Sequence, residues 1–565
     1  MSAVVISKVP EVAVHATATA AATISAKDAY DCAVVVFTDA PALVATAQTS
    51  SCKLAAAFAS LNAIDASAAD SVTISALPAG VFGGRVVFSP TGSLADDVDD
   101  VRKFGEAATA GFERAIAAGA KRPVLVLADA PIPCPAHAAK QPSASNLYNL
   151  FQVDDYKHCV EVALLGALQT SYVPLVTREH ISSTKSSKAL EKLDGLGLVV
   201  LNAPVSNESG EKHITQWLEK IALNARVIES GRRVMRDMGY ADSERMTPAK
   251  CAEYILQVLA PHSNLIKTKV IGDYEVLKKE YPLLAAVSQC ANGVARHHGH
   301  VVELDYRSPD QSQVKEDLYF IGKGVTFDTG GQTIKTDGHS RAMSRDKLGA
   351  CSLAGFMLAV ALLKPTHVNI HCKLGFVQNS IGSNAFLTDQ VLVSRAGVRL
   401  LITDTDGEGR LVMSDLLCEC KEMALAKAAA NPSSPPARLF TVATLTGHAI
   451  RAMGQYGIVL DNGPARRAGV SRRIAAAGHL YADPYEISSL RREDLAVIQS
   501  SESMQDIAQA NGQPSTQTAR GHQMPAAVMI EAAGLRKHGL IAQVSGGKDL
   551  QVAYTHVDIA ASAEE

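Results

Sequence analysis

The sequence predicts an α/β protein of two domains: a smaller N-terminal α/β domain and a larger C-terminal domain with a mixed sheet flanked by helices. The chain has 565 residues, which is more than a single hydrophobic core usually supports. Apolar, β-branched segments alternate with helical patterns along most of this length. A polar segment with Pro and Gly, residues 202–211, is typical of a boundary. We therefore expect an N-terminal domain over residues 1–205, a linker helix over 206–240 and the C-terminal domain over 241–565.

The N-terminal domain is expected to be a small sheet with helices between its strands. Apolar and β-branched runs predict strands at Ala33–Thr38, Arg85–Phe88, Pro123–Ala128 and Leu198–Leu201. Helical patterns lie at about Ala95–Ala118 and Asp154–Leu168. A longer helical pattern, about His213–Met238, forms the expected linker.

The C-terminal domain is expected to begin with a helix at Pro248, because proline suits the first helical position and Thr247 can cap the helix. Strands are then predicted at Val301–Tyr306, Leu318–Lys323, Asn369–Val377, up to Ile402, at Leu439–Ala443 and at Tyr554–Ile559. Helices are predicted between them at Ser352–Leu363 and Val412–Ala430. This alternation favours a mixed or parallel sheet covered on both faces, with functional groups at the carboxyl ends of its strands.

Composition excludes several classes of protein. The formal net charge is -3, so the chain as a whole has no strong attraction to nucleic acid or to an anionic membrane. Ten cysteines form no CxxC pair, which is typical of reduced thiols in a reducing compartment. The N-terminus lacks the features of a secretory signal, and no apolar run is long enough to span a bilayer. We expect a soluble cytoplasmic protein.

Two acidic, glycine-rich segments carry the chemistry. They are Gly322–Gly331 (GKGVTFDTGG) and Asp404–Leu411 (DTDGEGRL). Together with the residues that follow the first segment, they supply four carboxylates and three cationic groups: Asp328, Asp346, Asp406 and Glu408, with Lys323, Lys335 and Arg410. Carboxylates that converge in a dry cleft repel one another, and divalent cations remove that repulsion. Either segment alone is more typical of an ordinary turn, because Asp and Gly are the usual turn residues.

The two segments resemble the signature of the leucyl aminopeptidase family, the two-metal cytosol aminopeptidase type, in which GKGxTFDxGG and NTDAEGRL segments occur. Weaker similarity lies at Met246–Pro248, Ala443–Gly447 and His556–Ala560. The chain is therefore identified as a divergent member of this family, and residues 241–565 as its metallopeptidase catalytic domain.

The resemblance implies a metalloaminopeptidase that hydrolyses the N-terminal residue, preferably leucine-like, from peptides with a free N-terminus by means of a metal-bridged water. The implied ligands of two divalent ions, Zn or Mn, are Lys323, Asp328, Asp346, Asp406 and Glu408. The catalytic groups are expected to be Lys335, which polarises the scissile carbonyl, and Arg410, which holds a bicarbonate. The family also assembles as a homohexamer.

Three positions match the family's pocket for the N-terminal side chain: Met343, Thr444 and Gly447. Ordinary packing is the alternative for each of them. The chain departs from the family at Asp404, where asparagine is usual, at Gly407, where alanine is usual, and at Leu348, where glycine is common. The rim segment Gln378–Gln390 also lacks the usual prolines. The altered rim affects the expected substrate preference more than the expected chemistry, whereas the extra charge at Asp404 either tunes the metals or is solvated without effect.

Two alternatives stay open at this point. A catalytically weak or inactive family member with a structural or binding role is left open by the altered rim and by an ending at Glu565, where family members usually continue, although the intact ligand set argues against it. Nucleic-acid binding is the other alternative, but the balanced charge does not favour it.

Overall fold

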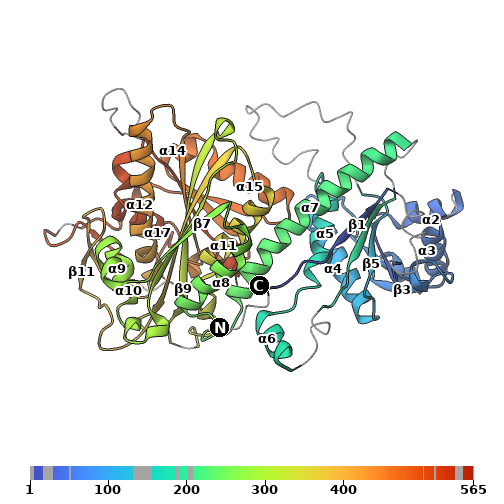
Figure 1. Cartoon of the computed structure of the whole chain (residues 1–565), viewed down its shortest axis with the longest axis horizontal. Coiled ribbons are helices and arrows are strands. Elements are labelled where there is room, and N and C mark those ends of the chain that lie inside the picture. The colour runs from blue at the N-terminus through green and yellow to red at the C-terminus, as the bar shows by residue number, and fades with distance from the viewer. Residues whose placement is uncertain are drawn as a thin grey trace. The chain divides into compact units, whose positions relative to one another are not determined.

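The computed structural model describes residues 6–16, 29–49, 52–130, 156–184, 191–201, 208–336, 338–500, 502–513, 517–540, 542 and 551–563. The chain forms two compact units. The smaller unit consists of Ser7–Ser230 and Ala476–Asp483, and the larger unit of Met1–Ile6, Gly231–Ala475 and Pro484–Glu565. Both are α/β structures, as predicted (Figure 1). Among the described residues, no helix combines the length and apolarity needed to cross a membrane.

The smaller unit is built on a six-stranded sheet with the order β1-β6-β5-β2-β4-β3. The strands are β1 (Val12–His15), β2 (Cys32–Phe37), β3 (Thr73–Ala76), β4 (Arg85–Pro90), β5 (Pro123–Leu127) and β6 (Leu196–Val200). Only β3 runs antiparallel to its neighbour. Its helices are α2 (Ala40–Thr49), α3 (Lys53–Ile64), α4 (Arg102–Ala117), α5 (Cys159–Gln169) and α6 (Leu175–Thr184). All four predicted strands are present, and β1 and β3 were not predicted.

One predicted helix start is wrong. The helical pattern begins near Ala95, but α4 begins at Arg102. Aspartate side chains in this segment accept hydrogen bonds from nearby backbone N–H groups, as Asp100 does from Arg102 at 2.9 Å. Such local bonds compete with helix formation. The predicted helix from Asp154 is present as α5, and its predicted first residue lies outside the described part of the chain.

The long helix α7 (Glu208–Gly239) contains the whole of the predicted His213–Met238 helix. It contributes residues to both compact units. Residues 202–207 of the predicted boundary lie outside the described residues.

The larger unit is built on an eight-stranded mixed sheet with the order β15-β14-β17-β13-β9-β10-β8-β7. Its strands are β7 (Ile266–Ile271), β8 (His300–Tyr306), β9 (Glu316–Asp328), β10 (Val368–Asn379), β13 (Ala437–Ala443), β14 (Gly457–Asp461), β15 (Tyr485–Ser489) and β17 (Ala553–Asp558). The strands β17, β13, β9 and β10 are mutually parallel, and β8 and β7 continue the sheet in antiparallel pairs. A separate three-stranded sheet contains β11 (Val391–Val393), β12 (Arg399–Leu401) and β16 (Ile507–Ala508).

Helices cover both faces of the large sheet, as the alternation predicts (Figure 1). They are α8 (Pro248–Leu259), α9 (Tyr274–Glu280), α10 (Pro282–Ser288), α11 (Leu348–Leu363), α12 (Glu408–Ala430), α13 (Gly447–Met453), α14 (Gly463–Arg467), α15 (Val470–Leu480), α16 (Arg492–Ala496) and α17 (Met524–Ala532). Residues of β9 alternate between the two faces: Ile321 lies in the core cluster with residues of α12, and Phe320 packs against Phe356 of α11, with ring centroids 5.2 Å apart.

Three further expectations need correction. The predicted strand that ends near Ile402 is β12, which belongs to the small sheet, so the second acidic segment does not follow a strand of the main sheet. The helix predicted from Val412 begins four residues earlier, at Glu408, so Glu408 and Arg410 are helical. Thr247 does occupy the position before α8, but its side chain makes no capping hydrogen bond.

The start of α11 lies unusually close to the main sheet. A Cβ atom added at Gly349 would lie 2.2 Å from the backbone oxygen of Val442 in β13. A Cβ atom added at Gly322 of β9 would lie 2.6 Å from Cα of Ala350. Because these contacts involve backbone on at least one side, a larger residue would force the helix away from the sheet.

We expect Gly349→Ala to destabilise the larger unit by about 1–3 kcal/mol, since overpacking of this size is not relieved by side-chain rotation. Urea unfolding followed by circular dichroism measures this. Gly293→Ala is the matched control, because its added Cβ would meet nothing within 4 Å. Equal stability of the two variants would contradict the close approach of α11.

Candidate metal centre

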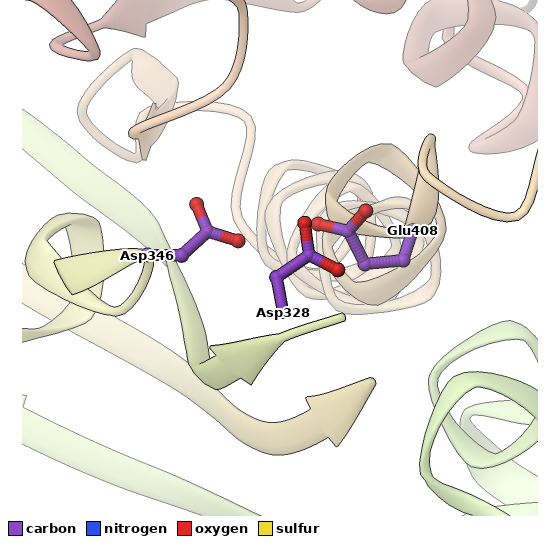
Figure 2. A group of neighbouring side chains, drawn as sticks. All are labelled: Asp328, Asp346 and Glu408. Carbon is purple, nitrogen blue, oxygen red and sulfur yellow. The ribbon is translucent and has the colours of Figure 1, made fainter. Parts of the chain in front are cut away.

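Three carboxylates that are far apart in the sequence meet at one point. They come from Asp328 at the end of β9, Asp346 just before α11 and Glu408 at the first position of α12. Each offers one oxygen atom, and these three oxygens lie within 4.8 Å of one another. All three residues are buried, with relative exposures of 3%, 8% and 1%. Figure 2 shows the carboxylates of Asp328 and Glu408 side by side, with that of Asp346 directed toward them.

Glycines make this convergence possible. Gly330 and Gly331 directly follow Asp328 and have φ angles of +83° and +63°, a conformation that disfavours side chains with a Cβ atom. The turn they form lets the Gly330 backbone N–H donate to Asp328 Oδ1 at 2.9 Å. On α12, a Cβ atom at Gly409 would lie 2.5 Å from Cε of Lys323, so only glycine leaves room for that lysine.

Lys323 links two of the carboxylates. Its Nζ lies 2.8 Å from Asp346 Oδ1 and 2.8 Å from Glu408 Oε1. It also donates to the backbone oxygen of Thr444 at 3.1 Å. The predicted amine ligand and two of the predicted carboxylate ligands are therefore in direct contact.

Lys335 links the remaining predicted residues to the cluster. Its Nζ lies 2.9 Å from Asp328 Oδ2 and 2.5 Å from Asp406 Oδ1. The structure thus brings together all five predicted metal ligands and the predicted catalytic lysine in one connected group.

The cluster has an excess of buried negative charge. Burial raises the pKa of Asp346 well above its ordinary value, and the carboxylates of Glu408 and Asp328 add to the effect while Lys323 opposes it. Burial and the charge of Asp328 also raise the pKa of Glu408, and they raise that of Asp406 to about 8. The pKa values of Lys323 and Lys335 are also raised: burial would lower them, but the neighbouring carboxylates outweigh that effect and keep both amines charged. Additional positive charge would therefore stabilise this site.

The donor atoms fit divalent cations. Oδ2 of Asp346 and Oε2 of Glu408 are buried and accept no hydrogen bond from the described residues. A buried acceptor without a partner is costly unless something else satisfies it. Carboxylate oxygens of this kind are ordinary ligands of Mg²⁺, Mn²⁺ or Zn²⁺, and a cation close to Lys323 would allow its amine to be neutral and to bind.

Arg410 lies two residues after Glu408, in the first turn of α12. It is 9% exposed, and its Nη1 donates to the backbone oxygen of Gln509 at 2.9 Å. Its Nε has no hydrogen-bond partner among the described residues. Burial lowers the pKa of Arg410, and the charges of Asp404, Glu408 and Asp406 oppose that change. The group can therefore hold an anion beside the carboxylate cluster.

The three predicted pocket residues differ in their relation to the cluster. Thr444 contacts it directly, because its Oγ1 donates to Asp346 Oδ1 at 2.9 Å. Met343 is half-buried and begins a short 3-10 turn, Met343–Arg345, that leads to Asp346. Gly447 is the exposed first residue of α13, and an added Cβ would meet nothing within 4 Å. The backbone oxygen of Met343 accepts from the backbone N–H of Asp346 at 3.3 Å. Among the described residues, no hydrogen bond joins Gly447 or the Met343 side chain to a ligand side chain.

Sequence patterns missed the residues that orient these ligands. Asn379, at the end of β10, donates from Nδ2 to Asp328 Oδ1 at 2.8 Å and to the Thr405 backbone oxygen at 3.1 Å. Thr405 in turn donates to the Gly330 backbone oxygen at 2.7 Å. A polar residue at the end of a buried apolar strand is the one signal that could have indicated Asn379.

Comparison with known proteins shows the family to which the chain belongs. The model of the cytosol aminopeptidase family, catalytic domain, matches residues 233–565. A Caenorhabditis elegans protein named "Putative aminopeptidase W07G4.4" is 37% identical over 476 residues, which is 84% of this chain and 80% of that protein. Two solved structures share the fold. Leucyl aminopeptidase from Trypanosoma cruzi has a TM-score of 0.69 and 16% identity over 99% of this chain and 94% of its own. The bottromycin maturation enzyme BotP in complex with Mn has a TM-score of 0.66 and 18% identity over 94% and 93%.

The family match covers more than half of the chain and includes every residue of the carboxylate cluster. The chain therefore belongs to the cytosol aminopeptidase family and is a metalloaminopeptidase.

Proposed function

We propose that the protein removes the N-terminal residue, with a preference for leucine-like side chains, from peptides with a free N-terminus, and that it does so with two divalent cations. The observation that carries this proposal is the convergence of Lys323, Asp328, Asp346, Asp406 and Glu408 with buried acceptor atoms left over. Two cations supply Lewis-acid activation of water and of a peptide carbonyl.

The chain's own groups have distinct tasks in this proposal. Asp328 and Glu408, at the centre of the cluster, are assigned to both cations, Lys323 and Asp346 to one, and Asp406 to the other. Asn379 fixes the orientation of Asp328 through its amide N–H, as second-shell groups commonly do. Burial of all these groups lowers the local dielectric, which strengthens every charge interaction at the site.

Two cationic side chains are assigned to negatively charged groups: Lys335 to the developing oxyanion and Arg410 to a bound anion. Lys335 lies beside both Asp328 and Asp406, and its side chain is 15% exposed, so its ammonium group can donate to the oxygen that becomes negative when the peptide carbonyl is attacked. Arg410 presents its Nε without a partner among the described residues, which suits a small anion. We assign bicarbonate to this position, where it would accept and release a proton near the reacting atoms.

The identity of the metal, the oligomeric state, the cellular location and the side-chain pocket are proposed by analogy with the family. Manganese is favoured by the solved relative that holds Mn, and zinc suits the same donor set. A homohexamer and a cytoplasmic location are proposed on the same basis. Thr444, Met343 and Gly447 are assigned to the pocket for the N-terminal side chain. A purely structural or binding role is less favoured, because Lys335 and Arg410 are both present and both lie at the cluster.

Removal of metal tests the proposed function. We expect the purified protein to hydrolyse leucine p-nitroanilide, to lose this activity on treatment with a chelator, and to regain it with Mn²⁺ or Zn²⁺. N-acetylated leucine p-nitroanilide should not be cleaved, because it has no basic amine for the site to hold. Metal uptake without turnover would favour the binding role, and turnover that survives complete metal removal would contradict the proposal.

Substitution of Lys335 tests its assigned task. We expect Lys335→Met to lower kcat by about 10²–10³, the usual effect of removing one oxyanion donor. Mn²⁺ binding should be retained, because Lys335 competes with cations for Asp328 and Asp406. Lys267→Met, at an exposed position on β7, is the control. A loss of activity explained entirely by lost Mn²⁺ binding would show that Lys335 has a different task.

A further inference from the structure

The loop that carries Asp406 and leads to Glu408 has no regular secondary structure of its own. It runs from Thr403 to Gly407, between the small sheet and α12. A ligand on such a loop needs support from neighbouring side chains, because small errors in its position weaken metal binding.

Gln509 supplies this support with both ends of one amide group. The residue follows β16 and is 0% exposed. Its Nε2 donates to the backbone oxygen of Gly407 at 2.8 Å. Its Oε1 accepts from the backbone N–H groups of Asp404 at 3.2 Å and Thr403 at 3.4 Å. The two ends of the loop are thus tied to a single buried side chain.

The backbone of Gln509 extends the same support to neighbouring elements. Its N–H donates to the backbone oxygen of Leu401 in β12 at 2.8 Å, and its oxygen accepts from Arg410 Nη1 at 2.9 Å. One residue therefore links the strand before the loop, the loop itself and the arginine after it.

The close approach of the Gln509 amide to the backbone explains why residue 407 is a glycine. A Cβ atom on Gly407 would lie 2.1 Å from Gln509 Nε2, in the space that the amide occupies. An alanine at 407 and the Gln509 side chain in its present position exclude each other. The leucyl aminopeptidase signature has alanine at this position. The glycine at 407 is therefore what allows the Gln509 side chain to occupy its present position.

We propose that Gln509 is a positioning residue that holds the Thr403–Gly407 loop, and so Asp406 and Glu408, in the geometry that binds the cations. The inference rests on the proposed function in so far as those residues are ligands. Gln509 itself touches neither the ligand carboxylates nor, in this account, the substrate.

The test compares Mn²⁺ affinity, measured by calorimetric titration of the metal-stripped full chain, with thermal unfolding. We expect Gln509→Met, which keeps the length of the side chain but none of its hydrogen bonds, to weaken Mn²⁺ binding by about 10- to 100-fold. The control is Gln505→Ala. Gln505 is a buried glutamine of the same segment whose side chain bonds to Ser500 and Glu502 and not to the loop.

A pair of variants tests the steric part of the inference. Gly407→Ala alone should weaken Mn²⁺ binding about as much as Gln509→Met, because the new methyl group displaces the amide. In the Gln509→Ala background, the same Gly407→Ala change should have less than a twofold further effect. Such non-additivity is expected for groups in contact or in one network and not for independent sites.

The outcomes are distinguishable. If Gln509→Met binds Mn²⁺ as tightly as Gln505→Ala does, the positioning role is wrong while the proposed function stands. The same conclusion follows if Gly407→Ala weakens Mn²⁺ binding equally in the presence and absence of the Gln509 side chain. If the unsubstituted chain binds no Mn²⁺, both the proposed function and this inference are wrong. Weakened Mn²⁺ binding with an unfolding temperature equal to that of Gln505→Ala supports the inference.

Discussion

Mutual repulsion among buried carboxylates is the constraint on which the larger unit depends. Asp328, Asp346 and Glu408 are each less than a tenth exposed, and their nearest cationic partners are two lysines. Isolated charges cannot be buried without compensation, so the surrounding fold must supply cations, hydrogen-bond donors or both. The pKa values of Asp346, Glu408 and Asp406 are all raised, chiefly by burial, and the neighbouring lysines offset only part of that effect. A cation bound from solution would compensate the remaining negative charge.

The geometry of the site follows from unusually close packing at its base. Gly322, Gly349 and Gly409 each stand where a Cβ atom would come within 2.6 Å of a neighbouring element or side chain. These contacts bring the starts of α11 and α12 directly against β9 and β13. As a result, Asp346 and Glu408 reach the end of β9 with no intervening layer of side chains. Side-chain hydrogen bonds from Asn379 and Gln509 then fix the orientation of individual loops.

The sequence predicted the mixed sheet and the cluster because both leave local signals. Asp328 and Glu408 stand in short glycine-rich segments whose spacing and resemblance point to metal binding, and β9 and β10 are long apolar runs. Other features leave no such signal. Asn379 is 51 residues away in sequence from Asp328, and Gln509 is 102 residues away from Gly407. Only the tertiary fold brings these pairs together. In the small sheet, β11 and β16 were not predicted because strands of two or three residues are too short to show a period, and β12 was not recognised as part of a separate sheet. The start of α12 was misplaced because Gly407 and Gly409 mask the helical pattern there.

The most direct test of the central claim is anomalous X-ray diffraction from crystals of the protein loaded with Mn²⁺. The account predicts two manganese peaks among Asp328, Asp346, Asp406 and Glu408, with Lys323 bound to one of them and Lys335 moved away from the carboxylates. Absence of manganese from this cluster, with Lys323 and Lys335 both paired to the carboxylates, would contradict it.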